Sequence, residues 1–152
     1  MPKFGQKSYS RLSTCEQSIQ TILMEVVKHY DIMIVEGNRT AERQNHHWSK
    51  GRRLQNGADK EKRFSWEVVN KAKIVTYKDG YEQKSKHQSF PSVAVDVVPW
   101  PSQWTDKNKM IELRGIIKYI QAKLFEEGRI SKLLDNGADL WDGFDMPHFQ
   151  IK

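Results

Sequence analysis

Apolar residues recur at helical spacing in two long segments of the chain. The first set is typical of an amphipathic helix with one face on a core: Ile19, Ile22, Leu23, Val26, Val27 and Tyr30. Ser13 and Glu16 stand before it with the spacing of a capping box, so we predict that the helix begins behind them. The same spacing predicts a second helix over 105–127, which ends at Gly128.

Three shorter apolar runs predict strands. Residues 32–36 form the first run and end at Gly37, residues 93–98 form the second, and residues 149–151 form the third. Alternation along the second run places the aspartate Asp96 on one face of an otherwise apolar strand. Together these elements predict an α+β fold in which two main helices pack on a small, mostly antiparallel sheet.

The other segments carry weaker signals. Thr40 has the residue type of a cap for a short helix, and residues 45–63 are predicted to be a long polar and basic surface excursion. Residues 65–69 are predicted to form a short helix and 74–77 a weak strand. Turns are expected at 79–80 and 136–137, where Asp-Gly and Asn-Gly pairs occur.

The length of 152 residues indicates one domain over residues 1–152. A single cysteine, Cys15, excludes an internal disulfide and fits either a reducing compartment or a protein indifferent to redox. We find no apolar run that predicts a transmembrane helix and no signal peptide at the N-terminus, so no stable membrane association is expected. If the protein acts outside the cytoplasm, a mechanism other than a signal peptide must release it.

The net charge of +6 predicts attraction to a polyanion: nucleic acid, an anionic membrane or an anionic cell wall. Basic residues are densest between Arg39 and Lys73. Charge patterning alone fits a solvated loop face equally well.

Two of the five histidines have a carboxylate at an unusual place nearby. His87 precedes the strand that holds Asp96, and a chain that doubles back between them can bring the two side chains together. His148 lies near the C-terminus, three residues after Asp145. A carboxylate inside an apolar strand needs a partner or a metal ion. Two histidines and an aspartate are also the kind of ligand set that a catalytic zinc takes, with a fourth position open for water.

The other histidines, His29, His46 and His47, are interpreted as structural or solvent-exposed. Asp145 can serve as the general acid and base beside His148. Asp135, Asp139 and Asp142 compete for that role, and spacing does not rank the four carboxylates.

The order of these motifs resembles the zinc peptidases of the VanY-like D-alanyl-D-alanine carboxypeptidase group, which belong to the lysostaphin, D-Ala-D-Ala peptidase and hedgehog zinc fold. The resemblance rests on Ser85-x-His87, Ala94-x-Asp96, Trp141, Asp145-x-Pro147-His148-Phe149, and Glu36-Gly37-Asn38-Arg39-Thr40 with Gln44. The closest likeness is to compact phage endolysins that cut the L-alanyl-D-glutamate bond of the peptidoglycan stem peptide. The loop between His87 and Asp96 and the basic 45–73 excursion are both longer than is usual in that family.

The resemblance implies zinc on His87, Asp96 and His148. It implies Asp145 as general acid and base and Arg39 as a substrate or oxyanion contact. Ser85, Gln44 and Trp141 are expected to support the site or to bind substrate.

The implied protein is a monomeric, bacteriolytic zinc metallopeptidase whose partner is bacterial peptidoglycan. It is expected to wait in the host cytoplasm and to reach the cell wall at phage lysis, which makes it a potential antimicrobial.

Two alternatives are open. A D,D-carboxypeptidase that removes the terminal D-Ala would use the same residues. A basic nucleic-acid-binding protein or His-Asn-His-like nuclease is suggested by the charge and by Asn45-His46-His47, but it leaves Asp96 and the Asp145–His148 pair without a role.

Overall fold

The computed structural model describes residues 1–101 and 104–152. The chain divides into two compact units, one formed by Met1–Asn38 with Phe90–Lys152 and the other by Arg39–Ser89. The prediction that residues 1–152 form one catalytic domain stays a prediction. Within the described residues, none of the helices combines the length and the apolar character needed to cross a bilayer.

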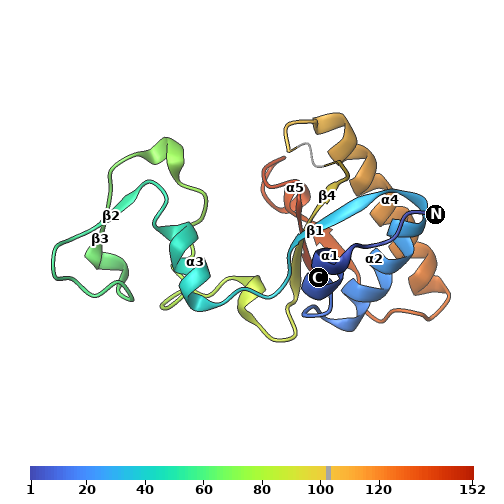
Figure 1. The fold of residues 1–152 in the computed structure, drawn as a ribbon, viewed down its shortest axis with the longest axis horizontal. Coiled ribbons are helices and arrows are strands. Elements are labelled where there is room, and N and C mark those ends of the chain that lie inside the picture. The colour runs from blue at the N-terminus through green and yellow to red at the C-terminus, as the bar shows by residue number, and fades with distance from the viewer. Residues whose placement is uncertain (102–103) are drawn as a thin grey trace. The chain divides into compact units, whose positions relative to one another are not determined.

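The larger unit is built on a four-stranded sheet in the order β1-β4-β6-β5. Its strands are β1 (Ile32–Glu36), β4 (Ala94–Pro99), β6 (His148–Ile151) and β5 (Leu134–Asn136), and every neighbouring pair is antiparallel. The helices are α1 (Gln6–Leu12), α2 (Gln17–His29), α4 (Lys107–Glu126) and the short α5 (Gly137–Leu140). The predicted α+β class, with a small antiparallel sheet and two main helices, is confirmed (Figure 1).

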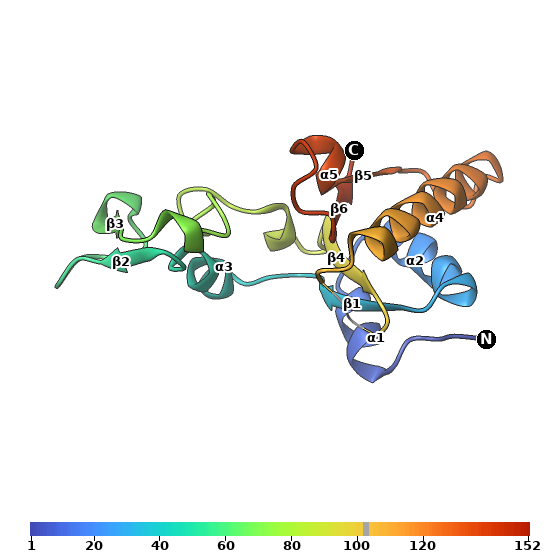
Figure 2. The ribbon, with the colours of Figure 1, turned by 90° about the horizontal axis from the view of Figure 1, so that it is seen from above.

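The core lies between one face of this sheet and the two long helices, which run side by side in Figures 1 and 2. The predicted apolar stripe of α2 is buried from Ile19 to Val27, as are Leu113 and Ile117 on α4. Val95 and Val97 of β4 face the same core. Because side chains alternate along a strand, Asp96 is directed to the opposite face.

The beginning of α2 differs from the prediction. Ser13 does not cap this helix, because it directly follows α1, and its hydroxyl donates a hydrogen bond to the carbonyl of Ser10 at 2.8 Å. Glu16 is the cap instead, since its carboxylate accepts from the amide of Ser18 at 2.8 Å. The second long helix begins as predicted, and Asp106 caps it by accepting from the amide of Lys109.

The smaller unit contains α3 (Ala41–Trp48), a two-stranded sheet of β2 (Arg52–Leu54) and β3 (Trp66–Val68), and three 3-10 turns, η1 (Arg63–Ser65), η2 (Lys71–Lys73) and η3 (Lys86–Gln88). Thr40 caps α3 as predicted, through the amide of Arg43. The excursion 45–63 is therefore partly ordered as helix and strand. The helix predicted at 65–69 is the strand β3, and the predicted strand at 74–77 does not form.

Polar side chains hold this smaller unit together. The buried carboxylate of Asp79 accepts hydrogen bonds from the amides of Tyr81, Glu82 and Gln83 at 2.7–3.1 Å, which makes the predicted 79–80 turn. The side-chain amide of Asn45 donates to the Asp79 carbonyl at 3.0 Å and so fixes this turn to α3. The residues that form these bonds are polar and show no apolar periodicity. For that reason the sequence of this region predicts an irregular loop.

Candidate metal centre

Asp96 and His148 meet because their strands are neighbours. The register of β4 and β6 places the two residues directly opposite each other, where cross-strand side chains lie close. The His148 Nδ1 atom lies 3.2 Å from the Asp96 Oδ1 atom. Their side chains are 8% and 17% exposed, so the pair is largely withdrawn from water.

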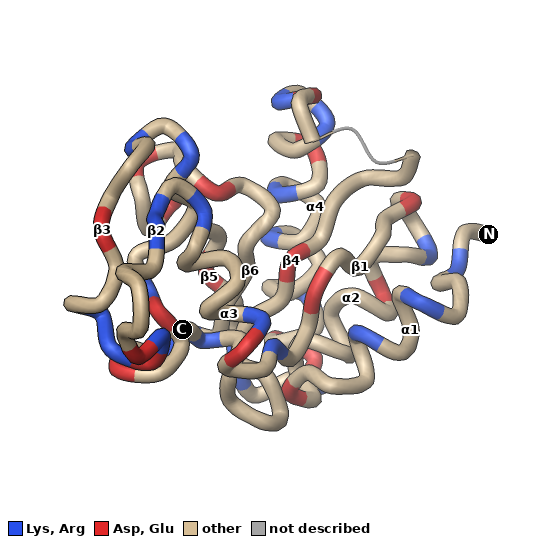
Figure 3. Tube along the Cα trace, turned by 60° about the vertical axis from the view of Figure 1, so that its left-hand side comes forward, with Lys and Arg blue, Asp and Glu red and all other residues tan. Residues whose placement is uncertain are grey.

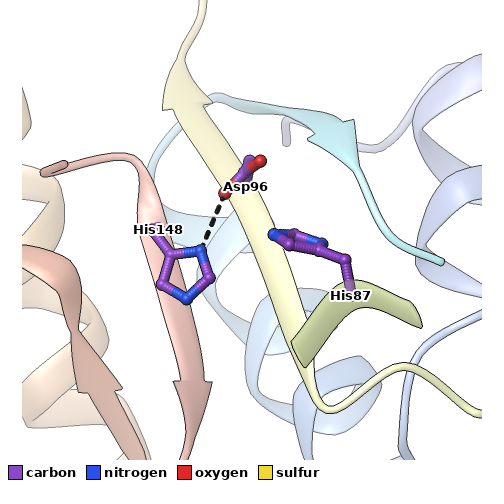
Figure 4. Close-up of side chains that lie close together, drawn as sticks. All are labelled: His87, Asp96 and His148. Atoms are coloured by element: carbon purple, nitrogen blue, oxygen red, sulfur yellow. Dashed lines mark hydrogen bonds and ion pairs between the residues drawn. The ribbon is translucent and has the colours of Figure 1, made fainter. Parts of the chain in front are cut away.

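His87 completes a group of three. It lies in η3, where the Ser85 hydroxyl accepts from the His87 amide and the Gln88 side chain accepts from the Ser85 amide, a capping box that fixes the turn. One ligand atom each from His87, Asp96 and His148 lies within 4.8 Å of the others (Figure 4). His87 is 2% exposed.

This donor set fits a metal ion. Two imidazoles and one carboxylate are the ligand types that transition metals such as zinc take in proteins, and three protein ligands leave a coordination position for water. The close approach of Asp96 to the two buried rings also offsets the cost of a carboxylate within an apolar strand. The three residues predicted as metal ligands are therefore brought together, and they can bind a metal ion.

Gln150 controls the orientation of the His148 ring. Its Oε1 atom lies 3.1 Å from His148 Nε2, while Nδ1 faces Asp96. Burial lowers the pKa of His148, but the hydrogen bond and charge of Asp96, with smaller contributions from Gln150 and Asp145, raise it above its ordinary value overall. With an Nε2–H that donates to Gln150, loss of the Nδ1 proton that faces Asp96 would leave Nδ1 as the nitrogen that binds a metal ion.

Asp145 lies in the turn between α5 and β6, with a left-handed φ of 56° that aspartate tolerates better than most residues. Its carbonyl accepts the His148 amide at 3.1 Å. Its charge also contributes to the raised pKa of His148. Two competing carboxylates have other partners, since Asp135 pairs with Lys152 at 3.5 Å, and Asp139 pairs with Arg114 and Lys118.

Two residues that sequence reasoning missed shape this turn. Residues 136–137 were expected to form only a turn, but Asn136 ends β5 and caps α5. Its buried side-chain amide donates to the carbonyls of Met146 at 2.7 Å and His148 at 3.0 Å. Gly137 packs so tightly that an added Cβ would lie 2.1 Å from the Asp145 carbonyl oxygen. The Asn-Gly pair was the sequence signal for these two residues. It predicts a turn, but it does not predict which residues the turn contacts.

The Trp141 ring lies beside that of His148. Its ring centroid lies 5.2 Å from that of His148 at an angle of 49°, and the residue is 45% exposed. An indole in this position covers the imidazole and still presents a face to solvent. Its predicted role in substrate binding stays a prediction.

The remaining predicted site residues belong to the smaller unit. The Arg39 amide donates to the His87 carbonyl at 2.8 Å, and an Arg39 Nη1 donates to Gln44 Oε1 at 2.7 Å. Gln44 is fully buried, and its Nε2 donates to the Lys78 carbonyl at 2.8 Å. Gln44 thus holds the Arg39 guanidinium, and the Arg39 backbone is joined to that of a candidate ligand.

The other histidines lie elsewhere. His29 is exposed at the end of α2 and lies 3.5 Å from Glu25, and His46 is exposed on α3. His47 was expected to be exposed but is half-buried.

Comparisons with known proteins identify the fold. No protein-family model matches the sequence, and no curated protein matches it. Among solved structures, the L-Ala D-Glu endopeptidase ChiX of Serratia marcescens is similar, with a TM-score of 0.62 and 17% identity over 98% of this chain and 89% of that one. Identity this low shows a shared fold alone. The peptidase fold implied by the sequence resemblance is thus confirmed, while the VanY-like family stays a prediction.

Proposed function

We propose that this protein is a zinc-dependent peptidase that hydrolyses the L-alanyl-D-glutamate bond of the peptidoglycan stem peptide. The observation that carries the proposal is the cluster of His87, Asp96 and His148, whose ligand atoms lie within 4.8 Å of one another. The likeness to a fold that also serves an L-Ala D-Glu endopeptidase supports the choice of substrate. The family resemblance in the sequence supports it independently.

In this proposal His87, Asp96 and His148 hold the zinc ion. A zinc ion supplies a bound water of pKa about 7 and polarises a carbonyl oxygen. Asp96 supplies the one negative charge among the three proposed ligands. Gln150 keeps the Nδ1 atom of His148 directed toward Asp96. The burial of both histidines keeps competing water away from the ligands.

Asp145 is assigned the proton transfers. Its carboxylate takes a proton from the attacking water as oxygen bonds to the alanyl carbonyl carbon. It then gives this proton to the glutamate nitrogen as the C–N bond breaks, which releases an alanine carboxylate and a new D-glutamate amine. The hydrogen bond from the His148 amide to the Asp145 carbonyl, which joins Asp145 to a proposed zinc ligand, supports this assignment.

Arg39 is assigned to the oxygen that gains negative charge. A guanidinium is permanently charged and donates through a rigid planar fork, which suits a developing oxyanion. Gln44 holds the group through its buried side chain. Trp141 offers an indole face against the substrate, and Ser85 supports the turn that carries His87.

Release of soluble fragments from purified cell walls tests this function. We expect the zinc-loaded protein to release fragments, a chelator to abolish the release, and added zinc to restore it. Activity that survives complete removal of metal would refute the metallopeptidase. The D,D-carboxypeptidase alternative is separated by its product, which is free D-Ala.

The biological setting is taken from the sequence resemblance to phage endolysins. We propose that the monomeric protein is made in the cytoplasm of an infected bacterium and reaches the wall through a membrane lesion at phage lysis. Cells whose inner membrane has been permeabilised should then lyse when the protein is present, whereas intact expressing cells should not. Lysis of cells with an undamaged membrane would contradict the dependence on a lesion.

A further inference from the structure

The positive charge of the protein is concentrated in its smaller unit. Residues 39–89 contain 13 Lys and Arg against 6 Asp and Glu, and the other residues contain 12 against 13. The smaller unit therefore carries +7 and the remainder −1. Figure 3 shows Lys and Arg along β2 and the loops that follow it. Apart from Arg39, the proposed chemistry at His87, Asp96 and His148 does not use this charge.

A groove of about 630 Å³ lies wholly within the smaller unit. Aromatic and basic side chains together line the groove, including Trp48, Phe64, Tyr77, Arg52, Arg63 and Lys71. Phe64 is 80% exposed and Tyr77 is 74% exposed. Single exposed rings are common on protein surfaces, but rings that gather in one groove beside cations mark a binding surface.

The buried indole of Trp48 lies among the groove's cations. The Arg52 guanidinium lies 3.4 Å from its ring centroid and that of Arg63 lies 4.8 Å away. Arg52 donates to the carbonyls of Trp48 and Thr76, and Arg63 pairs with Asp79 at 3.3 Å. Burial, and then the charge of Arg63, lower the pKa of Arg52. An anionic ligand beside these guanidiniums would relieve their mutual repulsion.

The Trp48 indole also offers a donor. Its Nε1 atom is buried and has no hydrogen-bond partner among the residues that the structure describes. A buried N–H group normally has a partner, because leaving it without one destabilises the folded protein. A bound oxygen atom in the groove would satisfy it.

We propose that this groove binds peptidoglycan and holds the enzyme on the cell wall. The choice of ligand rests on the proposed function. Peptidoglycan presents amphipathic sugar rings, against which Phe64 and Tyr77 can pack, and carboxylates, which a guanidinium pairs with through two parallel hydrogen bonds. The aromatic groove fits this mixture better than it fits the regular phosphates of a duplex, which are bound mainly by exposed cations.

Sedimentation with purified walls tests the proposal. The probe is the full-length Asp145→Asn protein mixed with peptidoglycan sacculi that have been freed of nucleic acid and of attached phosphate polymers. We expect the added Phe64→Ser and Tyr77→Ser pair, and separately Lys71→Gln, to weaken binding, by about tenfold for the ring pair. All three side chains are exposed, so the melting temperature should not change.

Matched controls come from the larger unit. Tyr119→Ser removes a ring that is 72% exposed, and Lys107→Gln removes an exposed charge at the start of α4; both should bind walls as the parent does. Groove variants that bind like the parent would overturn the proposal. So would equally tight binding of a DNA duplex that the same variants abolish.

The readouts separate this proposal from the proposed function. With Asp145 intact, the ring pair should release wall fragments more slowly yet cleave a short soluble stem peptide at the parent rate. If the parent protein binds sacculi through the groove but cleaves neither substrate, the peptidase assignment fails and the binding site stands. If cleavage of the short peptide and of walls both persist in the groove variants at the parent rate, the groove assignment fails alone.

Discussion

Gly137 is predicted to set the position of Asp145, and Gly137→Ala tests this without touching a ligand. The added Cβ would lie 2.1 Å from the Asp145 carbonyl oxygen and 3.1 Å from Trp141 Cζ3. A carbon and an oxygen approach to about 3.3 Å at closest, so the turn must move by about 1.2 Å. A misplacement of about 1 Å at a catalytic group can cost about 100-fold in rate. We therefore expect kcat/KM on a stem peptide to fall about 100-fold while zinc content stays stoichiometric.

The melting temperature of Gly137→Ala shows whether a loss of activity comes from displacement of Asp145 or from unfolding of the protein. Overpacking of this kind costs about 1–3 kcal/mol, which in a chain of this length lowers the melting temperature by about 2–12 °C and leaves the protein folded at room temperature. Gly115→Ala is the matched control, because nothing lies within 4 Å of its added Cβ on α4. That control should keep full activity and be stabilised by about 0.5–1 kcal/mol. A folded Gly137→Ala protein with parental activity would refute the placement of Asp145 at the reacting atoms.

Three further outcomes follow from the same geometry. His148→Ala should lose both zinc, measured by elemental analysis, and activity, whereas Asp145→Asn should keep zinc and lose activity; full activity in Asp145→Asn would move the role to a neighbouring aspartate. Gln150→Leu should weaken zinc binding about 10–100-fold in a competition titration. Gln150→Glu should recover most of that affinity, because it restores an oxygen that accepts from His148 Nε2. Equal zinc affinity in the parent and both variants would exclude the orienting role of Gln150. Cys15 should resist alkylation in the native protein at pH 8 and react after unfolding, because burial raises the pKa of its thiol to about 11; rapid native labelling would contradict its burial.

The sequence predicted the elements that bury apolar faces. The stripe on α2, the apolar run of β4 and the cap at Asp106 are local signals, and the structure has each of them where expected. The helix α1 was missed because it buries only two of its residues, Ser8 and Leu12, and so has little periodicity. The β2–β3 pair was missed because none of its residues is buried.

The candidate site was predictable in its membership but not in its geometry. His87, Asp96 and His148 were selected by residue type and by a family resemblance, and neither contains a distance. The contact between Asp96 and His148 depends on the register of β4 against β6, which pairs residues 52 positions apart. No local pattern specifies that register. The roles of Asn136 and Gly137 depend on the same long-range packing, so they emerged only from the structure.

The central claim is tested most directly by the chemical identity of the ends that the protein creates in purified peptidoglycan. We predict that zinc-loaded protein produces a new D-glutamate amino terminus and a matching alanine carboxylate, identified by mass spectrometry, and that His87→Ala produces neither. Release of free D-Ala without a new D-glutamate terminus would contradict the assigned bond. The same new ends from metal-free protein would contradict the metal centre.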